Sequence, residues 1–172
     1  MKKKGNTSDF TEDRDNELQR SFIEVLRTGG EMPLRDMFGA AAARPASRFW
    51  VSETRAAIVI GAMMRGHEPE RMYRKRREMF EEIYRRVREK MAADPALLMT
   101  HAVNQTVYEP APEFYLTPES ARSIIYRIRQ RRRRMSMIKK TLDSKRKGER
   151  EERRGKREKR VRKERVRNEK RG

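Results

Sequence analysis

The sequence predicts a mainly α-helical fold, in which a small helical domain precedes a long basic C-terminal arm. Three observations lead to this fold class. Apolar residues recur at helical spacing between proline, glycine and capping residues. Aromatic side chains concentrate in the first 120 residues, which contain Trp50, all six phenylalanines and four of the five tyrosines. After position 121 apolar side chains become sparse, so this part of the chain cannot bury a core of its own.

The N-terminal part of the chain predicts two helices. Residues 1–10 are expected to be disordered, and a first helix begins near Thr11 or Asp13 with acidic residues in its first turn. Gly29 ends this helix. A second helix begins at Pro33, because proline is favoured in a first turn, and it stops before Pro45.

The middle of the chain predicts an extended segment between helices. Residues 48–51, Arg-Phe-Trp-Val, favour an extended conformation. Ser52 then provides an N-cap for an apolar helix that ends near Met64. A long charged helix is expected over residues 69–91, because its apolar positions share one face while Arg, Lys and Glu occupy the others.

Two further helices are expected toward the C-terminus. Asp94 and Pro95 resemble a cap and a first turn, and they predict a short helix that ends near Gln105. Residues 107–116 favour an extended chain. Thr117 opens a final helix, which is expected to continue into the basic arm.

A short internal repeat accompanies these elements. Pro45-Ala-Ser-Arg-Phe-Trp-Val-Ser matches Pro110-Ala-Pro-Glu-Phe-Tyr-Leu-Thr at an offset of 65 residues. The match predicts a duplicated helix–Pro-Ala–strand–helix unit, with copies at about 33–65 and 95–130 linked by the charged helix. The two strand-like segments are expected to pair as a minor two-stranded element. The alternative is a chance recurrence of a common pattern of turn and helix.

The repeat also predicts a core. Apolar residues of both copies are expected to meet in it: Phe49, Val51, Ile60, Phe114, Leu116 and Ile125. Trp50 and Tyr115 lie within the same segments and are interpreted as core residues. The alternative for these two is stacking on nucleic-acid bases.

The net charge lies almost entirely at the C-terminal end. Residues 121–172 contain 25 of the 45 Lys and Arg but only 7 of the 26 Asp and Glu, a net charge of +18, whereas residues 1–120 carry a net charge of +1. The helical domain is therefore predicted to span residues 11–138, and the basic arm residues 139–172. Such an arm favours polyanions, so nucleic acid, either DNA or RNA, is the first partner predicted.

Arginine predominates where this basic region begins. Its planar guanidinium group suits phosphate, which it binds with two parallel hydrogen bonds. The predicted nucleic-acid-binding residues are Arg122, Arg127, Arg129, Arg131, Arg132, Arg133, Arg134, Lys139, Lys140, Lys145, Arg146 and Lys147. The alternatives are an acidic protein partner or a solvated helix face. Beyond residue 145 acidic residues alternate with basic ones, and this tail is interpreted as a disordered arm that becomes helical on a polyanion.

No catalytic, metal or cofactor site is predicted. The chain has no cysteine, and His67 and His101 lack metal-ligand spacing to each other. No apolar segment is long enough to cross a membrane, so we expect an intracellular protein, cytoplasmic or nucleoid-associated, or nuclear in a eukaryotic host. The predicted function is that of a non-enzymatic accessory or architectural nucleic-acid-binding protein. The alternative is an assembly or adaptor protein whose neutral body binds a protein partner while the arm docks on an acidic surface.

Overall fold

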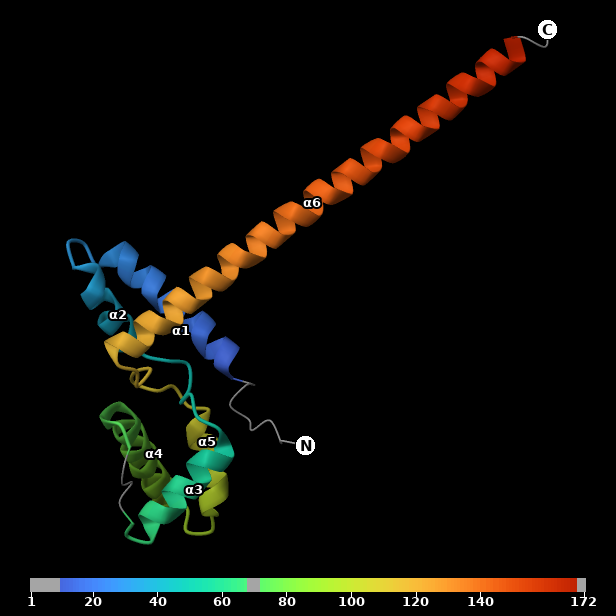
Figure 1. Ribbon diagram of the computed structural model, residues 1–172. Coiled ribbons are helices and arrows are strands. Elements are labelled where there is room, and N and C mark those ends of the chain that lie inside the picture. The colour runs from blue at the N-terminus through green and yellow to red at the C-terminus, as the bar shows by residue number, and fades with distance from the viewer. Residues whose placement is uncertain (1–9, 68–71, 170–172) are drawn as a thin grey trace. The chain divides into compact units, whose positions relative to one another are not determined.

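The structure is a computed structural model that describes residues 10–67 and 72–169 (Figure 1). The predicted disordered N-terminus therefore lies outside the described residues, except for Phe10. The described chain forms six helices: α1 (Thr11–Thr28), α2 (Leu34–Ala42), α3 (Glu53–Met64), α4 (Arg74–Ala93), α5 (Met99–Val107) and α6 (Pro118–Glu169). This part of the chain contains no strand, and the mainly α-helical prediction is confirmed. The chain divides into two units, residues 1–126 and 127–172, so α6 begins in the first unit and forms the second.

The helices recur with the same offset as the sequence repeat. α5 begins and ends 65 residues after α2, and α6 begins 65 residues after α3. Equivalent hydroxyls cap α3 and α6. The Ser52 Oγ accepts a hydrogen bond from the N–H of Arg55 at 3.3 Å, and the Thr117 Oγ1 accepts one from the N–H of Ser120 at 3.2 Å.

The same positions are buried in both copies. The buried residues of α2 are Met37, Phe38, Ala41 and Ala42. Those of α5 are Ala102, Val103, Thr106 and Val107, each 65 residues after its counterpart in α2. The two copies therefore present equivalent faces to the core, although few of these residues are identical.

The two Pro-Ala turns join the copies by a reciprocal pair of hydrogen bonds. Ala46 and Ala111 are equivalent residues, and each donates its N–H to the carbonyl of the other at 2.9 Å. This isolated antiparallel bridge is the contact that forms in place of the expected two-stranded element. A longer ladder is prevented in part because Pro45 and Pro110 have no N–H to donate.

A second reciprocal pair of hydrogen bonds ends the α2 and α5 helices. The N–H of Phe49 donates to the carbonyl of Val107 at 3.1 Å, and the equivalent N–H of Phe114 donates to the carbonyl of Ala42 at 2.9 Å. Val107 and Ala42 are the last residues of their helices, where carbonyl groups lack an intrahelical partner. Each copy therefore satisfies the C-terminal end of a helix in the other copy.

The charged helix α4, which was expected to link the copies, is itself part of the repeat. α1 and α4 end 65 residues apart, and α4 packs on α5 as α1 packs on α2. Leu18 and Phe22 of α1 are buried, as are the equivalent Ile83 and Val87 of α4. Each copy thus contains three helices, and the two copies together account for all six helices of the described chain.

The third helix of each copy packs on the other copy. α3 contacts α4 and α5, and Figure 1 shows these three helices gathered in one group. The first turns of α6 contact α2, where the rings of Phe38 and Tyr126 lie 5.9 Å apart. A Cβ atom added at Gly39 would lie 3.3 Å from the ring of Pro118, so α2 and the start of α6 are closely packed. Neither copy completes its core alone.

Two helices begin later than predicted. α4 begins at Arg74, and the predicted start at residue 69 falls among residues 68–71, outside the described chain. α5 begins at Met99, because Asp94 accepts a hydrogen bond from the N–H of Ala96 at 3.1 Å and forms a tight turn. Asp94 and Pro95 therefore belong to a connection, and the prediction of a helix start there was wrong.

The predicted core is largely confirmed. Five of its six residues are buried, namely Phe49, Val51, Ile60, Phe114 and Ile125. Leu116 is only partly buried. Trp50 and Tyr115 are also partly buried, and Tyr115 stacks on Phe49 with the ring centroids 6.1 Å apart. The two aromatic residues lie at the edge of the core, with part of each side chain exposed.

The final helix continues through the tail to Glu169, whereas disorder was expected beyond residue 145. Opposite charges four residues apart support this helix. Lys147 lies 4.0 Å from Glu151, and Lys156 lies 2.5 Å from Glu152. The prediction that the final helix enters the basic arm is confirmed.

Substitution of Phe49 by alanine should unfold a large fraction of the protein. The ring is fully buried between the copies, and its loss is expected to cost about 3–5 kcal/mol of the free energy of unfolding. Urea denaturation followed by circular dichroism measures this change. Ile58→Ala is the control, because Ile58 is 58% exposed and should cost under about 1 kcal/mol. Equal effects of the two substitutions would contradict a core at Phe49.

Candidate nucleic-acid interface

All the predicted nucleic-acid-binding residues lie on α6, and all are exposed. Arg122 belongs to the first unit, in which the start of α6 packs. The others belong to the second unit: Arg127, Arg129, Arg131, Arg132, Arg133, Arg134, Lys139, Lys140, Lys145, Arg146 and Lys147. The helix therefore holds these cations at regular intervals along its axis, with about 1.5 Å of rise per residue.

The first part of this surface contains no acidic residue. Between Glu119 and Asp143 the sequence has nine basic residues and no aspartate or glutamate. Like charges at a spacing of four residues, such as Arg129 and Arg133, lie next to each other on a helix and destabilise it by a few tenths of a kcal/mol per pair. An anion that lies between such residues would remove this repulsion.

The apolar stripe of α6 is buried only at its start. Ala121 and Ile125 are fully or almost fully buried in the first unit, and Ile124 is 7% exposed. Farther along, Met135 is 59% exposed and Ile138 is 44% exposed. The compact unit ends at Tyr126, so the buried part of the stripe lies within it.

The distal part of α6 has a different electrostatic character. Glutamates recur among the basic residues, and some of them form ion pairs within the helix, as Glu151 and Glu152 do with neighbouring lysines. Exposed ion pairs of this kind contribute little to stability, but they neutralise part of the positive charge. The acid-free part of α6 therefore carries a denser net positive charge than the tail.

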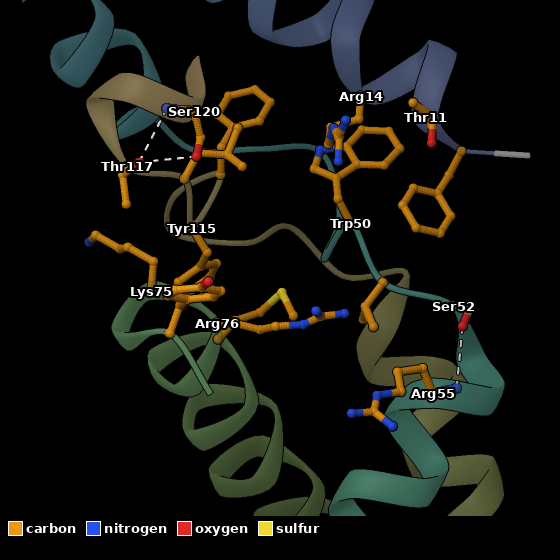
Figure 2. Close-up of a pocket in the computed structure, with 16 residues that line it drawn as sticks. Thr11, Arg14, Trp50, Ser52, Arg55, Lys75, Arg76, Tyr115, Thr117 and Ser120 are labelled. Carbon is orange, nitrogen blue, oxygen red and sulfur yellow. Dashed lines mark hydrogen bonds between the residues drawn. The ribbon is translucent and has the colours of Figure 1, made fainter. Parts of the chain in front are cut away.

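A second feature of the first unit is a cavity of about 550 Å³ that lies between the two copies of the repeat (Figure 2). Its walls come from the starts of α1 and α4 and from the aromatic segments that lead into α3 and α6. The N-cap residues of all four helices line it: Phe10, Ser52, Tyr73 and Thr117. Since a helix N-terminus carries partial positive charge, four such ends favour an anion in the cavity.

The side chains that line the cavity are mostly cationic, aromatic and hydroxylic. The cations are Arg14, Arg55, Lys75 and Arg76, and no aspartate or glutamate is among the described lining residues. Arg14 forms an ion pair with the neighbouring Asp15 at 2.7 Å. Figure 2 shows Arg55 and Arg76 extending into the space from opposite sides. The guanidinium groups of these two residues form no ion pair with another described residue.

Acidic residues close to one wall are neutralised by partners. Glu113 accepts a hydrogen bond from the Lys75 ammonium group at 2.7 Å, and this contact raises the pKa of Lys75 above its usual value. Burial, together with the nearby charges of Glu82 and Glu113, raises the pKa of Tyr115. The Tyr115 hydroxyl therefore stays protonated at neutral pH.

Tyr115 also has an unusual backbone conformation. Its φ angle is +52°, in the left-handed region that residues other than glycine seldom adopt. Its counterpart Trp50 does not share this conformation, so the two walls of the cavity differ. Such backbone strain is common at ligand-binding positions, where surrounding contacts hold it in place.

Sequence reasoning did not identify this cavity, although a signal was present. Residues 74–77, Arg-Lys-Arg-Arg, form the first turn of α4, and no acidic residue lies in that turn. Basic residues at a helix N-terminus are unfavourable because they oppose the helix dipole. The expected helix start at residue 69 placed these four residues inside the helix, where they looked like an ordinary solvated face.

Comparisons with protein-family models, curated proteins and solved structures found no match to this chain. Among the described residues no group of three or more His, Asp or Glu side chains could hold a metal ion. None of the helices in that part of the chain has the length and apolar character needed to span a membrane.

Removal of residues 145–172 should leave the stability of the first unit unchanged. The described side chains of this segment are almost all exposed, so its loss uncovers no core. The thermal midpoint, measured by the near-ultraviolet circular dichroism of the aromatic residues, should move by less than about 2 °C. Loss of the cooperative transition on truncation would show that the tail is part of the folded core.

Proposed function

We propose that this protein is a non-enzymatic nucleic-acid-binding protein, an accessory or architectural factor that contacts phosphates through α6. The observation that carries the proposal is the acid-free basic segment between Glu119 and Asp143, which lies on an exposed helix. Arginine is well suited to this role, because each guanidinium group can donate two hydrogen bonds to one phosphate. The energy source is the release of counterions from the nucleic acid, so affinity falls as salt rises.

The body and the arm would have different roles in such a protein. The first unit has few net charges and fixes the start of α6 through Ala121 and Ile125. The rest of the helix presents its cations in a regular array along its length. Phosphate contacts of this type give affinity with little sequence preference. We therefore propose that the protein binds DNA or RNA mainly through the backbone.

Helix formation and binding would support each other. The arginines of α6 repel one another along the helix, and phosphates placed between them would reduce that repulsion. A helix that is already formed also loses less conformational entropy on binding than a disordered tail does. The first effect favours the acid-free segment over the glutamate-containing tail as the main contact region, because the acidic residues of the tail already reduce the repulsion there.

One observation favours a second candidate function, in which the protein is an adaptor. Met135, Met137, Ile138 and Leu142 are exposed on α6 among the basic residues. A helix with apolar and basic faces suits a groove with an acidic rim on a protein partner. The dependence on salt separates the two candidates, since a protein interface with an apolar centre responds less steeply to salt than a phosphate interface does.

Replacement of Arg131–Arg134 by glutamine should weaken nucleic-acid binding by at least about tenfold at low salt. The slope of log affinity against log salt should fall in magnitude by about one for each phosphate that the variant no longer binds. Fluorescence anisotropy with a short labelled duplex, measured over a range of salt concentrations, gives both values.

The matched control replaces four basic residues of the distal segment: Lys145, Arg146, Lys147 and Arg150. It removes the same charge from the same helix, but from the region where glutamates already neutralise part of it. We expect a smaller loss of affinity than for Arg131–Arg134. Equal losses would indicate a diffuse electrostatic attraction without an organised site. Absence of any effect in both variants would favour the adaptor function.

A further inference from the structure

We propose that the cavity between the two copies of the repeat binds the phosphate group of a small phosphate-bearing ligand. This site is separate from the α6 surface and does not depend on the function proposed for that helix. Three observations support it: the arrangement of charge on the cavity wall, the guanidinium groups that lack an ion-pair partner, and the helix ends that surround the cavity.

The first observation concerns the arrangement of charge. Equivalent residues of the two copies face each other across the cavity. In four of these pairs one residue is a cation and its equivalent in the other copy is neutral. These pairs are Arg14 with Met79, Arg55 with Ser120, Lys75 with Phe10 and Arg76 with Thr11. The cations are therefore spread around the cavity, which limits their repulsion. Arg14 and Lys75 are paired with Asp15 and Glu113, so the guanidinium groups of Arg55 and Arg76 are the ones left to meet an anion.

The second observation concerns hydrogen-bond donors that lack an acceptor. The guanidinium groups of Arg55 and Arg76 have no ion-pair partner among the described residues and reach into the cavity. Trp50 also lines the cavity, but its indole Nε1 is buried within the wall and is not one of these donors. The site thus offers two charged donors to an acceptor that the described chain does not supply.

The third observation is that the first turns of the surrounding helices favour an anion. α4 begins with basic residues, which oppose its dipole. In α3 the first-turn carboxylate of Glu53 points elsewhere, since it accepts a hydrogen bond from the hydroxyl of Tyr108 at 2.5 Å. An anion in the cavity would interact favourably with both helix ends and with Arg76, whereas no side chain of the described wall provides a negative charge.

Phosphate fits these donors better than a carboxylate does. A phosphate dianion has three terminal oxygens and can accept hydrogen bonds from two guanidinium groups at once. The hydroxyls of Ser52 and Ser120 at opposite helix starts add further possible donors. The volume of about 550 Å³ leaves room for more than the phosphate itself, so a substituent of moderate size can enter with it.

The single tryptophan of the chain provides a direct test. Because Trp50 is the only one, its indole N–H gives one separate resonance in an ¹H–¹⁵N correlation spectrum. Titration of the full chain with inorganic phosphate should move this resonance, with saturation in about the millimolar range, because Trp50 lines the cavity and a bound phosphate changes its surroundings. Phosphate should also raise the thermal midpoint, because a ligand that binds only the folded state stabilises it.

The matched pair of variants is Arg76→Gln and Arg77→Gln. Both residues lie in the first turn of α4 and both are exposed, but only Arg76 lines the cavity. Arg76→Gln should raise the dissociation constant for phosphate by about tenfold or more, whereas Arg77→Gln should change it by less than about twofold. Arg55→Gln gives a second test on the opposite wall, so the result does not rest on one variant.

A wild-type indole resonance that does not respond to phosphate, or an equal response in the Arg76→Gln and Arg77→Gln proteins, would overturn the proposal. The source of the phosphate is then tested with short oligonucleotides that carry either a 5′-phosphate or a 5′-hydroxyl, added to the protein with Arg131–Arg134 replaced by glutamine. A shift caused by the 5′-phosphate form alone supports recognition of a nucleic-acid end. A shift caused by inorganic phosphate but by neither oligonucleotide supports a free metabolite as the ligand. Neither result bears on the binding role of α6, which the salt titration of the Arg131–Arg134 variant tests separately.

Discussion

The reciprocal hydrogen bonds between the Pro-Ala turns are the constraint on which the rest of the structure depends. The Ala46–Ala111 bridge fixes the two copies against each other at equivalent residues. Because the nearby N–H groups of Phe49 and Phe114 end the α5 and α2 helices of the opposite copy, the chain must cross between copies at this point. Beyond this crossing α3 packs on α4 and α5, and the start of α6 packs on α2. A single three-helix copy would leave these backbone groups without partners and its apolar faces uncovered.

The same crossing explains why a cavity with cationic and hydroxyl side chains in its wall exists in so small a domain. Each copy restarts a helix directly after it passes the centre, and its first helix also begins there, so four helix N-termini meet. N–H groups at such ends have no intrahelical acceptor and need another partner. The two capping hydroxyls, on Ser52 and Thr117, satisfy some of them. The remaining positive potential, together with the basic first turn of α4, gives the cavity its preference for an anion.

Sequence reasoning succeeded where local signals were strong and failed where a boundary was set by tertiary structure. The repeat was visible because the residues at the crossing, such as Phe49 and Phe114, occupy equivalent buried positions and make equivalent hydrogen bonds. The equivalence of α1 and α4 was not visible, since only a few buried positions such as Leu18 and Ile83 have to be alike, and the exposed faces are free to differ. The start of α4 could not be predicted from composition, and this error concealed the cavity. The apolar stripe of α6 continues beyond its buried part, to Met135 and Ile138, so the sequence pattern alone does not mark where burial ends.

The origin of the arm can be traced to one position of the repeat. α3 ends at Met64, and two residues later Gly66 adopts a φ angle of +81°, a conformation that glycine tolerates and most residues avoid. The equivalent position in α6 is Arg131, for which that conformation is unfavourable, and the helix continues. The α6 helix therefore lacks the glycine that follows the end of α3. The densest run of arginines begins at the position where that glycine is missing. The basic helix is in this sense an extension of the last element of the repeat, which explains why its first turns are buried in the core while its later turns are exposed.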